Sequence, residues 1–316
     1  MTILDTVSIR QTECLCIGLL PWPVTLVAHV PRSRATNWLL LMAAAFLFST
    51  GGAAIKAISM TPWQIASFRS GIAALALAVF VPDGRRHWRW ALLPVAAAYA
   101  ATLVSFTLAT KLTTSANAIF LQSTAPLYLL LIGPLLLKEP LGRSDLLFLT
   151  AVAAGMLLCF GSAQPAVATA PDPRTGNLMG AVSGLSWALT VSGLRWLGRR
   201  EGAGNSATAT VVLGNLLAFL VTLPKALPPP HAGLLNLSVL LYLGVFQIGL
   251  AYLFVTRAIR HVPAFEATTV LLLEPALNPV WVWLVQGERP AASSISGGVL
   301  ILSATVLNAW WQNRRG

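Results

Sequence analysis

The feature that most limits the possible folds of this chain is a series of apolar runs, each about 20 residues long and joined by short links. A helix of about 20 residues spans the hydrocarbon core of a bilayer, which is roughly 30 Å thick. Pro and Gly occur in the links, as at Pro171-Asp172-Pro173 and Pro228-Pro229-Pro230. Because these residues end helices and form turns, we predict an all-α polytopic membrane protein without a soluble domain.

Ten transmembrane helices are expected from these runs. They are placed near residues 38–58, 63–81, 90–110, 116–137, 146–161, 177–197, 208–223, 237–255, 265–285 and 294–311. The composition agrees, because 56% of the residues are hydrophobic and only 10% are charged, whereas soluble proteins have roughly 25% charged residues. The three cysteines provide no disulfide framework, and no Cys/His spacing indicates a metal site.

Residues 1–36 differ in character from the rest of the chain. The apolar stretch Ile17–Val30 is short, contains Pro21 and Pro23, and follows charges of both signs. A cleaved signal peptide instead has a basic start and an uninterrupted apolar segment. We therefore expect a cytoplasmic or interfacial extension, or an over-long start of the chain.

The basic residues orient the predicted helices. The net charge of +11 would suggest nucleic acid as a partner of a soluble protein, but in a membrane protein Lys and Arg gather in cytoplasmic loops. A cytoplasmic N-terminus puts fifteen of the 21 basic residues in inside segments and five in outside segments. We therefore predict a multi-pass protein of the inner or plasma membrane with both termini in the cytoplasm, and no nucleic-acid partner.

One stretch of the chain occurs twice. Residues 107–139 and 256–288 align without a gap at a constant offset of 149, with six of 33 positions identical. Each copy has the same features in the same order: a basic residue, a short polar segment, an apolar run with a central proline, and a glutamate (Glu139 or Glu288). Five predicted crossings separate matching points, so the second copy is inverted. The sequence predicts two inverted five-helix repeats, at residues 37–162 and 176–313.

This architecture indicates transport rather than catalysis. Inverted repeats are a recurrent construction of secondary transporters, which hold a substrate near the bilayer midplane and alternate its access. No Gly-rich phosphate loop with Lys and Ser/Thr is present, so ATP hydrolysis within this chain is unsupported. Residues 180–184 lack the Gly-x-Ser-x-Gly spacing, and no His-Glu-x-x-His occurs. We therefore expect no enzymatic activity and no cofactor.

Three stretches carry a family resemblance: Trp63–Arg69, the segment from Ala125-Pro126 through Lys138-Glu139-Pro140, and the segment from Glu274-Pro275 through Gly287-Glu288. Together they resemble the EamA family of the drug/metabolite transporter superfamily. The resemblance covers about residues 38–313. It implies ten helices in two inverted repeats and export or exchange of small metabolites, such as amino acids.

Glu274 is the sharpest candidate for a coupling residue, because it lies near the middle of the apolar run 265–285. An ionised carboxylate there costs several kcal/mol unless it faces a polar cavity or a partner. Since burial disfavours its charged form, Glu274 is a candidate proton carrier in exchange transport. The alternative is a hydrogen-bonded glutamate that locks helices together. Glu266 lies eight residues earlier and is either a second coupling candidate or a solvated acid at a helix start.

Pro126, Pro275 and Pro279 are candidates for breaks in the duplicated helices. A proline has no N–H and leaves the carbonyl four residues earlier without its helical donor. Such carbonyls are able to meet a cationic group or water, and paired broken helices mark transporter sites. Prolines are also tolerated in membrane helices for packing alone.

Arg69 lies six residues after Trp63, inside the second predicted helix. Three roles are open: it attracts an anionic group of the substrate, pairs with an acid, or reaches outward as an anchor. Lys56 and Lys111, near outer helix ends, are expected to be interface anchors. Glu139 and Glu288 are expected to be structural or gating residues.

Gln122, Ser123, Trp187 and Asn278 fall within the central thirds of their predicted helices. They are candidates for the lining of a substrate cavity. Polar side chains at such positions also form hydrogen bonds between helices without contacting a substrate, and Trp187 fits simple packing.

The sequence therefore predicts a secondary transporter, an exporter of amino acids or related metabolites that cycles by alternating access with proton coupling. The expected partners are a small-molecule substrate, the lipid bilayer and protons, and the expected state is a monomer or homodimer. An uncoupled uniporter or channel-like facilitator is the alternative, because the same cavity would work without coupling through Glu274.

Overall fold

The computed structural model describes residues 34–85, 88–129, 143–161, 167–201, 206–228, 233–258 and 270–315. Residues Ser33–Gly316 form one compact unit. Within the described ranges the chain is helical, apart from turns and an isolated bridge between Val167 and Ala170. The prediction of an all-α chain is confirmed for these residues.

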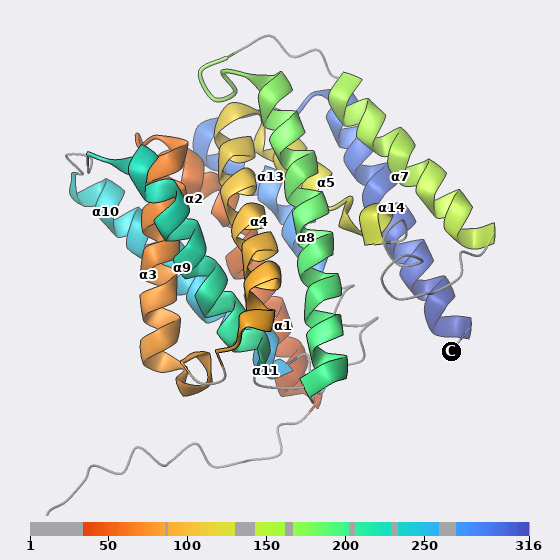
Figure 1. Cartoon of the computed structure of the whole chain (residues 1–316). Helices are drawn as coiled ribbons and strands as arrows, with labels where there is room; N and C mark the ends of the chain where they lie inside the picture. The colour runs from red at the N-terminus through yellow and green to blue at the C-terminus, as the bar shows by residue number, and fades with distance from the viewer. Residues whose placement is uncertain are drawn as a thin grey trace, which may run out of the picture. The chain divides into compact units, whose positions relative to one another are not determined.

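The helices follow the predicted apolar runs (Figure 1). The first half contains α1 (Arg34–Ser49), α2 (Gly51–Ala57), α3 (Pro62–Phe80), η1 (Pro82–Gly84), η2 (Trp90–Leu92), α4 (Leu93–Leu112), α5 (Ser115–Gln122) and α7 (Arg143–Gly161). The second half contains α8 (Pro173–Glu201), α9 (Ser206–Ala226), α10 (Leu234–Leu241), the π-helix η3 (Tyr242–Leu250), α11 (Ala251–Ala258), α13 (Leu273–Gln286) and α14 (Ala292–Arg315).

Local sequence signals explain where α3 begins and where α13 ends. Thr61 accepts a hydrogen bond from the Gln64 backbone N–H at 3.2 Å, and its own N–H donates to Gln64 Oε1 at 3.1 Å. This is a capping box followed by a proline at the first helical position, Pro62. Gly287 ends α13 with φ of 68°, a left-handed conformation that glycine adopts without strain.

Five helical segments in the described part of the chain are long and apolar enough to cross a bilayer. They are Ala35–Ala57, Pro62–Phe80, Trp90–Leu112, Ala207–Ala226 and Leu234–Val255. Shorter apolar segments occur at Leu146–Gly161 and Ala292–Asn308. The predicted span 177–197 lies inside the longer α8, and the spans 116–137 and 265–285 extend beyond the described residues. Several crossings of the membrane therefore agree with the predicted fold class.

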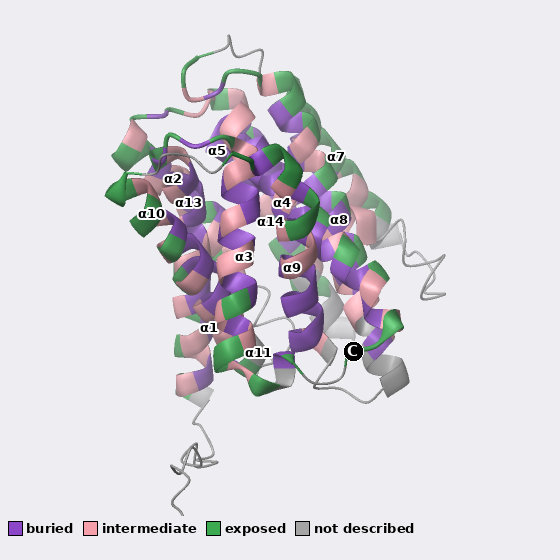
Figure 2. Ribbon diagram, turned by 60° about the vertical axis from the view of Figure 1, so that its left-hand side comes forward, coloured by how far each residue is buried: buried purple, intermediate pink, exposed green. Residues whose placement is uncertain are grey.

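The distribution of side chains is that of a membrane protein. Large apolar residues lie exposed on the outer faces of helices: Leu147 of α7 is 74% exposed and Leu75 of α3 is 67% exposed. Many Ser, Thr and Asn side chains are buried instead, including Ser67, Thr107 and Asn215. Figure 2 shows buried residues along the inner faces of α3, α4, α8 and α9. An apolar outer surface around a partly polar interior fits a helix bundle surrounded by lipid.

The helices of one half pack mainly against helices of the other. Prominent pairs are α3 with α9, α7 with α14, α4 with α8, α1 with α11, α5 with α8, α1 with α13, α4 with α9, and α3 with η3. Figure 1 shows α7 alongside α14 and α3 beside α9. The predicted repeat matches each helix of the first half to the helix five places later in the chain. Under this matching the α4–α8 pair corresponds to the α1–α11 pair, and the α4–α9 pair corresponds to the α3–η3 pair.

The contact between α7 and α14 depends on glycine. A Cβ added at Gly297 would lie 2.6 Å from the Gly155 carbonyl oxygen and 2.9 Å from Cys159 Sγ. A Cβ at Gly155 would lie 2.9 Å from the Gly297 carbonyl oxygen. The two backbones approach so closely that no side chain fits between them, which is the usual way in which small residues join membrane helices.

Replacing Gly297 with alanine is expected to destabilise the protein by about 1–3 kcal/mol, because overpacking forces the two helices apart. Thermal unfolding in detergent measures the change. Gly161→Ala is the matched control, since a Cβ there would meet no atom within 4 Å. Equal effects of the two substitutions would contradict the proposed role of close packing.

Candidate functional site

A buried ion pair joins the two halves at one end of the bundle. Lys56 Nζ lies 2.6 Å from Glu288 Oε2, and the two side chains are only 3% and 5% exposed. Lys56 also donates to the carbonyl oxygens of Thr113, at 3.0 Å, and Thr169. Glu288 Oε1 accepts the backbone N–H of Ser115 at 2.7 Å. This arrangement surrounds both charges with partners, as a buried pair requires.

Neighbouring residues extend this contact. Ser115 Oγ donates to Asn278 Oδ1 at 2.7 Å. We call Lys56, Thr113, Ser115, Asn278 and Glu288 the Lys56–Glu288 network. Lys56, Thr113 and Ser115 belong to the first half of the chain, whereas Asn278 and Glu288 belong to the second.

Backbone geometry brings the members of this network together. The left-handed turn at Gly287 directs the chain out of α13 just before Glu288, and Thr114 caps α5 by accepting the Asn117 backbone N–H at 3.3 Å. Gly52 lets α2 approach closely, since a Cβ there would lie 2.6 Å from Asn278 Oδ1 and also contact Ser115 Oγ. The network therefore depends on the end of α13, the start of α5 and the close approach of α2 at Gly52.

The network changes the interpretation of two predicted residues. Lys56 was expected at the membrane interface, but its side chain is buried because Glu288 and two carbonyl oxygens hold it inside the bundle. Asn278, a candidate for the cavity lining, is fully buried within the network. The expected structural or gating role of Glu288 fits its position between the halves.

A second polar group lies deeper in the bundle. It consists of Arg69 on α3, Tyr99 on α4, Asn215 on α9 and Tyr252 on α11, which we call the arginine–tyrosine cluster. The rings of Tyr99 and Tyr252 meet edge to face with centroids 5.4 Å apart. Asn215 Nδ2 lies 3.5 Å from Tyr99 Oη and donates to the Val211 carbonyl at 2.9 Å. The cluster joins four helices from both halves.

Arg69 is 1% exposed and is the largest fully buried side chain of the described residues. Its Nη2 donates to the Leu103 carbonyl oxygen at 2.9 Å, whereas its Nε has no hydrogen-bond partner in the described part of the chain. The side chain interacts electrostatically with Tyr99 and Tyr252. Because it points into the bundle, an outward-reaching anchor is excluded.

Glu274 lies at the start of α13, partly buried. Its charge acts on the Tyr252 phenol, as does the charge of Arg69. Within the described residues no ion pair joins Arg69 to an acidic side chain. The charges of Arg69 and of the predicted coupling residue therefore act on the same phenol.

Both duplicated helices are interrupted at matching places. The first leaves helical geometry at Ser123 and Thr124 and resumes at Ala125; the second has a turn at Leu272. Ser123 and Leu272 correspond under the offset of 149, and each lies three residues before a proline, Pro126 or Pro275. The missing proline N–H explains the position of these interruptions. Pro279 lies within α13.

The other predicted residues lie at varied positions. Ser123 Oγ donates to the Ile119 carbonyl at 2.8 Å, and Gln122 is half-buried at the end of α5. Trp187 packs against the apolar residues around Tyr99. Glu266 and Glu139 lie outside the described residues.

Sequence reasoning missed Tyr99, Asn215 and Tyr252. A tyrosine in an apolar run resembles a packing or interface residue, so its pattern carries little information. All four tyrosines fall inside predicted spans, so position alone did not single out Tyr99 and Tyr252; the signal that was present is Asn215, a polar residue within the run 208–223.

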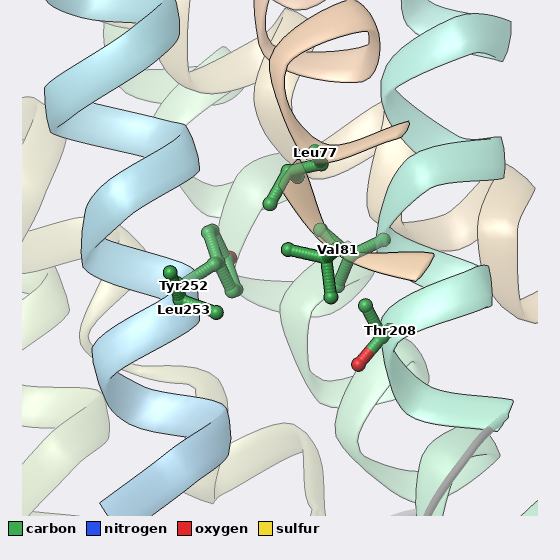
Figure 3. Close-up of a pocket in the computed structure, with 6 residues that line it drawn as sticks. Leu77, Val81, Thr208, Tyr252 and Leu253 are labelled. Carbon is green, nitrogen blue, oxygen red and sulfur yellow. The ribbon is translucent and has the colours of Figure 1, made fainter. Parts of the chain in front are cut away.

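A small apolar pocket lies beside the cluster. It is lined by Leu77, Val81, Thr208, Val211, Tyr252 and Leu253. Figure 3 shows Tyr252 and Leu253 facing Leu77 and Val81, with Thr208 opposite. Leu77 and Val81 belong to the end of α3 that lies away from Lys56, so the pocket and the Lys56–Glu288 network are at opposite ends of that helix.

Comparison with known families identifies the chain. The EamA-like transporter family matches twice, over residues 36–161 and 174–310. The chain belongs to the EamA-like transporter family. It is therefore a multi-pass membrane transporter with a small-molecule substrate, as the sequence predicted.

Individual proteins agree with this EamA assignment. The pseudopaline exporter CntI of Pseudomonas aeruginosa strain UCBPP-PA14 is 28% identical over 276 residues, which cover 85% of this chain and 94% of that protein. CntI of strain PAO1 is also 28% identical, over 279 residues. An uncharacterized transporter of Clostridium kluyveri is 33% identical over 95 residues, 29% of this chain and 30% of that protein.

A protein crystal structure shares the fold. Its TM-score is 0.58 at 19% identity, and the match covers 89% of this chain and 99% of that chain. At this identity the match supports the arrangement of the helices and says nothing about the substrate.

Proposed function

We propose that this EamA-family protein exports small metabolites, amino acids or related solutes, by alternating access driven by proton exchange. The direction of transport is supported by CntI, a full-length relative that is named an exporter. The observation that carries the proposal is Glu274, a partly buried acid in the first turn of α13 whose charge acts on Tyr252 of the arginine–tyrosine cluster. A carboxyl group placed there is able to carry a proton between the two sides of the membrane.

The proposed architecture is ten transmembrane helices in two inverted repeats, at residues 37–162 and 176–313, after an extension over residues 1–36. Both termini lie in the cytoplasm. Two family matches and the helix pairs that exchange between halves support this arrangement. An odd number of crossings between the repeats places the approximate two-fold axis in the membrane plane, as in other alternating-access transporters.

We infer that the described form is closed at its extracytoplasmic end. In the proposed orientation the Lys56–Glu288 network lies at the extracytoplasmic side, where it joins the two halves. The small pocket beside Tyr252 lies toward the cytoplasmic side. Opening of the outer end requires the Lys56–Glu288 pair to separate. We therefore expect this pair to form and break during transport.

Proton coupling is expected to drive accumulation of substrate. In proteoliposomes containing the purified protein, an acidic lumen should drive uptake of a labelled substrate above its external concentration, and a protonophore should abolish the excess. L-Leucine, L-lysine, uracil and ethidium are suitable probes of four solute classes. Protein-free liposomes are the control.

Equal uptake with and without the pH gradient would contradict proton coupling and identify the uncoupled uniporter. Counterflow of the same probes without a gradient separates this outcome from inactive protein, because a uniporter exchanges labelled for unlabelled solute.

A further inference from the structure

We propose that the first half of the chain carries a binding site for a small carboxylate, formed by Lys56 Nζ and the start of α5 at Ser115. In the closed form the side chain of Glu288 fills this site. When the two halves separate, a carboxylate from solution takes its place. The inference goes beyond the proposed function, because neither proton coupling nor the identity of the substrate enters it.

The contacts of Glu288 are those of a bound anion. Its Oε1 accepts the Ser115 backbone N–H at 2.7 Å, and its Oε2 lies 2.6 Å from Lys56 Nζ. Ser115 is the first residue of α5, and the N–H groups and positive dipole at a helix start bind anions. Each oxygen has its own donor, an arrangement that matches the two oxygens of a carboxylate, whereas a chloride ion presents a single centre.

The lysine of this site is held in place by the first half alone. Lys56 of α2 donates to the carbonyl oxygen of Thr113, which ends α4, at 3.0 Å. In return Lys111 of α4 donates to the carbonyl oxygen of Ile58, which ends α2, at 2.6 Å. Each ammonium group thus lies at the negative end of the neighbouring helix. Because the second half makes neither contact, Lys56 keeps its position when the halves separate.

The charges around the site favour an anion. Within the described part of the chain Lys111 forms no ion pair, and the acid that pairs with Lys56 is Glu288. Departure of the Glu288 carboxylate therefore leaves two ammonium groups and a helix N-terminus at one end of the first half. Positive groups gathered in this way attract a small anion.

Asn278 gives a second, independent indication of a ligand. Its side chain is fully buried, and its Oδ1 accepts the Ser115 hydroxyl at 2.7 Å. Its Nδ2 has no hydrogen-bond partner among the described residues. A buried amide donor without an acceptor is costly. This donor is therefore available to an oxygen of a ligand that enters beside Ser115.

Chemical rescue of Glu288→Ala tests the site, because this substitution removes the tethered carboxylate and leaves its space. The variant should unfold in detergent at a lower temperature than the wild type. Sodium formate at about 0.1 M, about 100-fold above a Kd near 1 mM, should recover about half of the lost Tm. Formate should also slow hydrogen exchange over 113–117, since the Ser115 N–H regains an acceptor. Sodium chloride and sodium phosphate of equal ionic strength should recover little.

Three proteins serve as controls for this rescue. Glu288→Gln fills the same space with an amide, Lys56→Met/Glu288→Ala lacks the cationic donor, and in the wild type Glu288 occupies the site. None of the three should gain Tm in formate. An equal gain in any of them would reveal a general effect of formate and overturn the proposal, as would the absence of rescue in Glu288→Ala.

A measurement with the site intact decides the question even where Glu288→Ala fails to fold. Ser59 and Ala292 are exposed, lie in opposite halves and flank the site in sequence. Spin labels attached after Ser59→Cys and Ala292→Cys report the separation of the halves. Cys14→Ser and Cys16→Ser prevent labelling elsewhere, because Cys159 is buried.

Formate should increase the population with widely separated labels, because it competes with the Glu288 carboxylate for Lys56 and Ser115. Chloride of equal ionic strength should leave the distance distribution unchanged. Identical distributions in formate and chloride would overturn the proposed competition. Since these measurements use neither a pH gradient nor a transported solute, failure of proton-coupled export would leave their result intact.

Discussion

Replacing Glu274 with glutamine is expected to abolish accumulation driven by a pH gradient while leaving the protein folded and inserted. Glutamine has nearly the same shape but binds no proton in the physiological range, so proton movement is separated from substrate movement. The wild-type protein should concentrate substrate in proteoliposomes with an acidic lumen, whereas Glu274→Gln should at most equilibrate it. Initial rates of labelled uptake with and without the gradient measure the effect.

Asp172→Asn provides a matched control for this loss of a carboxylate. Asp172 is exposed and accepts the Thr175 backbone N–H at 3.2 Å at the start of α8. An asparagine oxygen accepts the same hydrogen bond, so this variant should transport as the wild type does. Undiminished gradient-driven uptake by Glu274→Gln would remove Glu274 from the coupling mechanism.

Breaking the buried pair at the outer end should have the second large effect. Lys56→Met or Glu288→Gln is expected to destabilise the closed form by about 3–5 kcal/mol, because each substitution leaves one buried charge without its partner. The double variant Lys56→Met/Glu288→Gln should lose less than the sum of the single variants, since no isolated charge remains. Thermal unfolding of the four proteins in detergent measures this coupling.

Hydrogen exchange locates the change. The Ser115 N–H donates to Glu288 Oε1, so the segment 113–117 should exchange faster in both single variants. Lys225→Gln is the control, because Lys225 is exposed and its Nζ lies 4.2 Å from the Trp63 ring centroid, outside the network. Additive effects of the two single substitutions, or unchanged exchange over 113–117, would show that the pair does not hold the outer end closed.

Much of the fold followed from one-dimensional patterns. The apolar runs predicted the helices because a bilayer requires long apolar segments with internally paired backbones. In the structure, Thr61, Pro62 and Gly287 define helix ends through contacts between adjacent residues. The matched prolines indicated interruptions because the proline backbone lacks a donor wherever it occurs.

The candidate site was only partly predictable. Glu274 and Arg69 attracted attention because a charge in an apolar run is costly and therefore informative. Lys56 was misplaced for a related reason: a lysine near a helix end resembles an interface anchor until its partner is known. Tyr99 and Tyr252 carried too weak a signal to be selected, since tyrosine also serves packing and membrane interfaces.

The sequence by itself determined that this chain is a membrane transporter of repeated construction with an acid inside a helix, because hydropathy and local backbone chemistry act over neighbouring residues. Only the tertiary structure decided which residues meet. It paired Lys56 with Glu288 and gathered Arg69, Tyr99, Asn215 and Tyr252 from four helices. Those contacts depend on how helices from opposite halves rotate and pack, which no local pattern records.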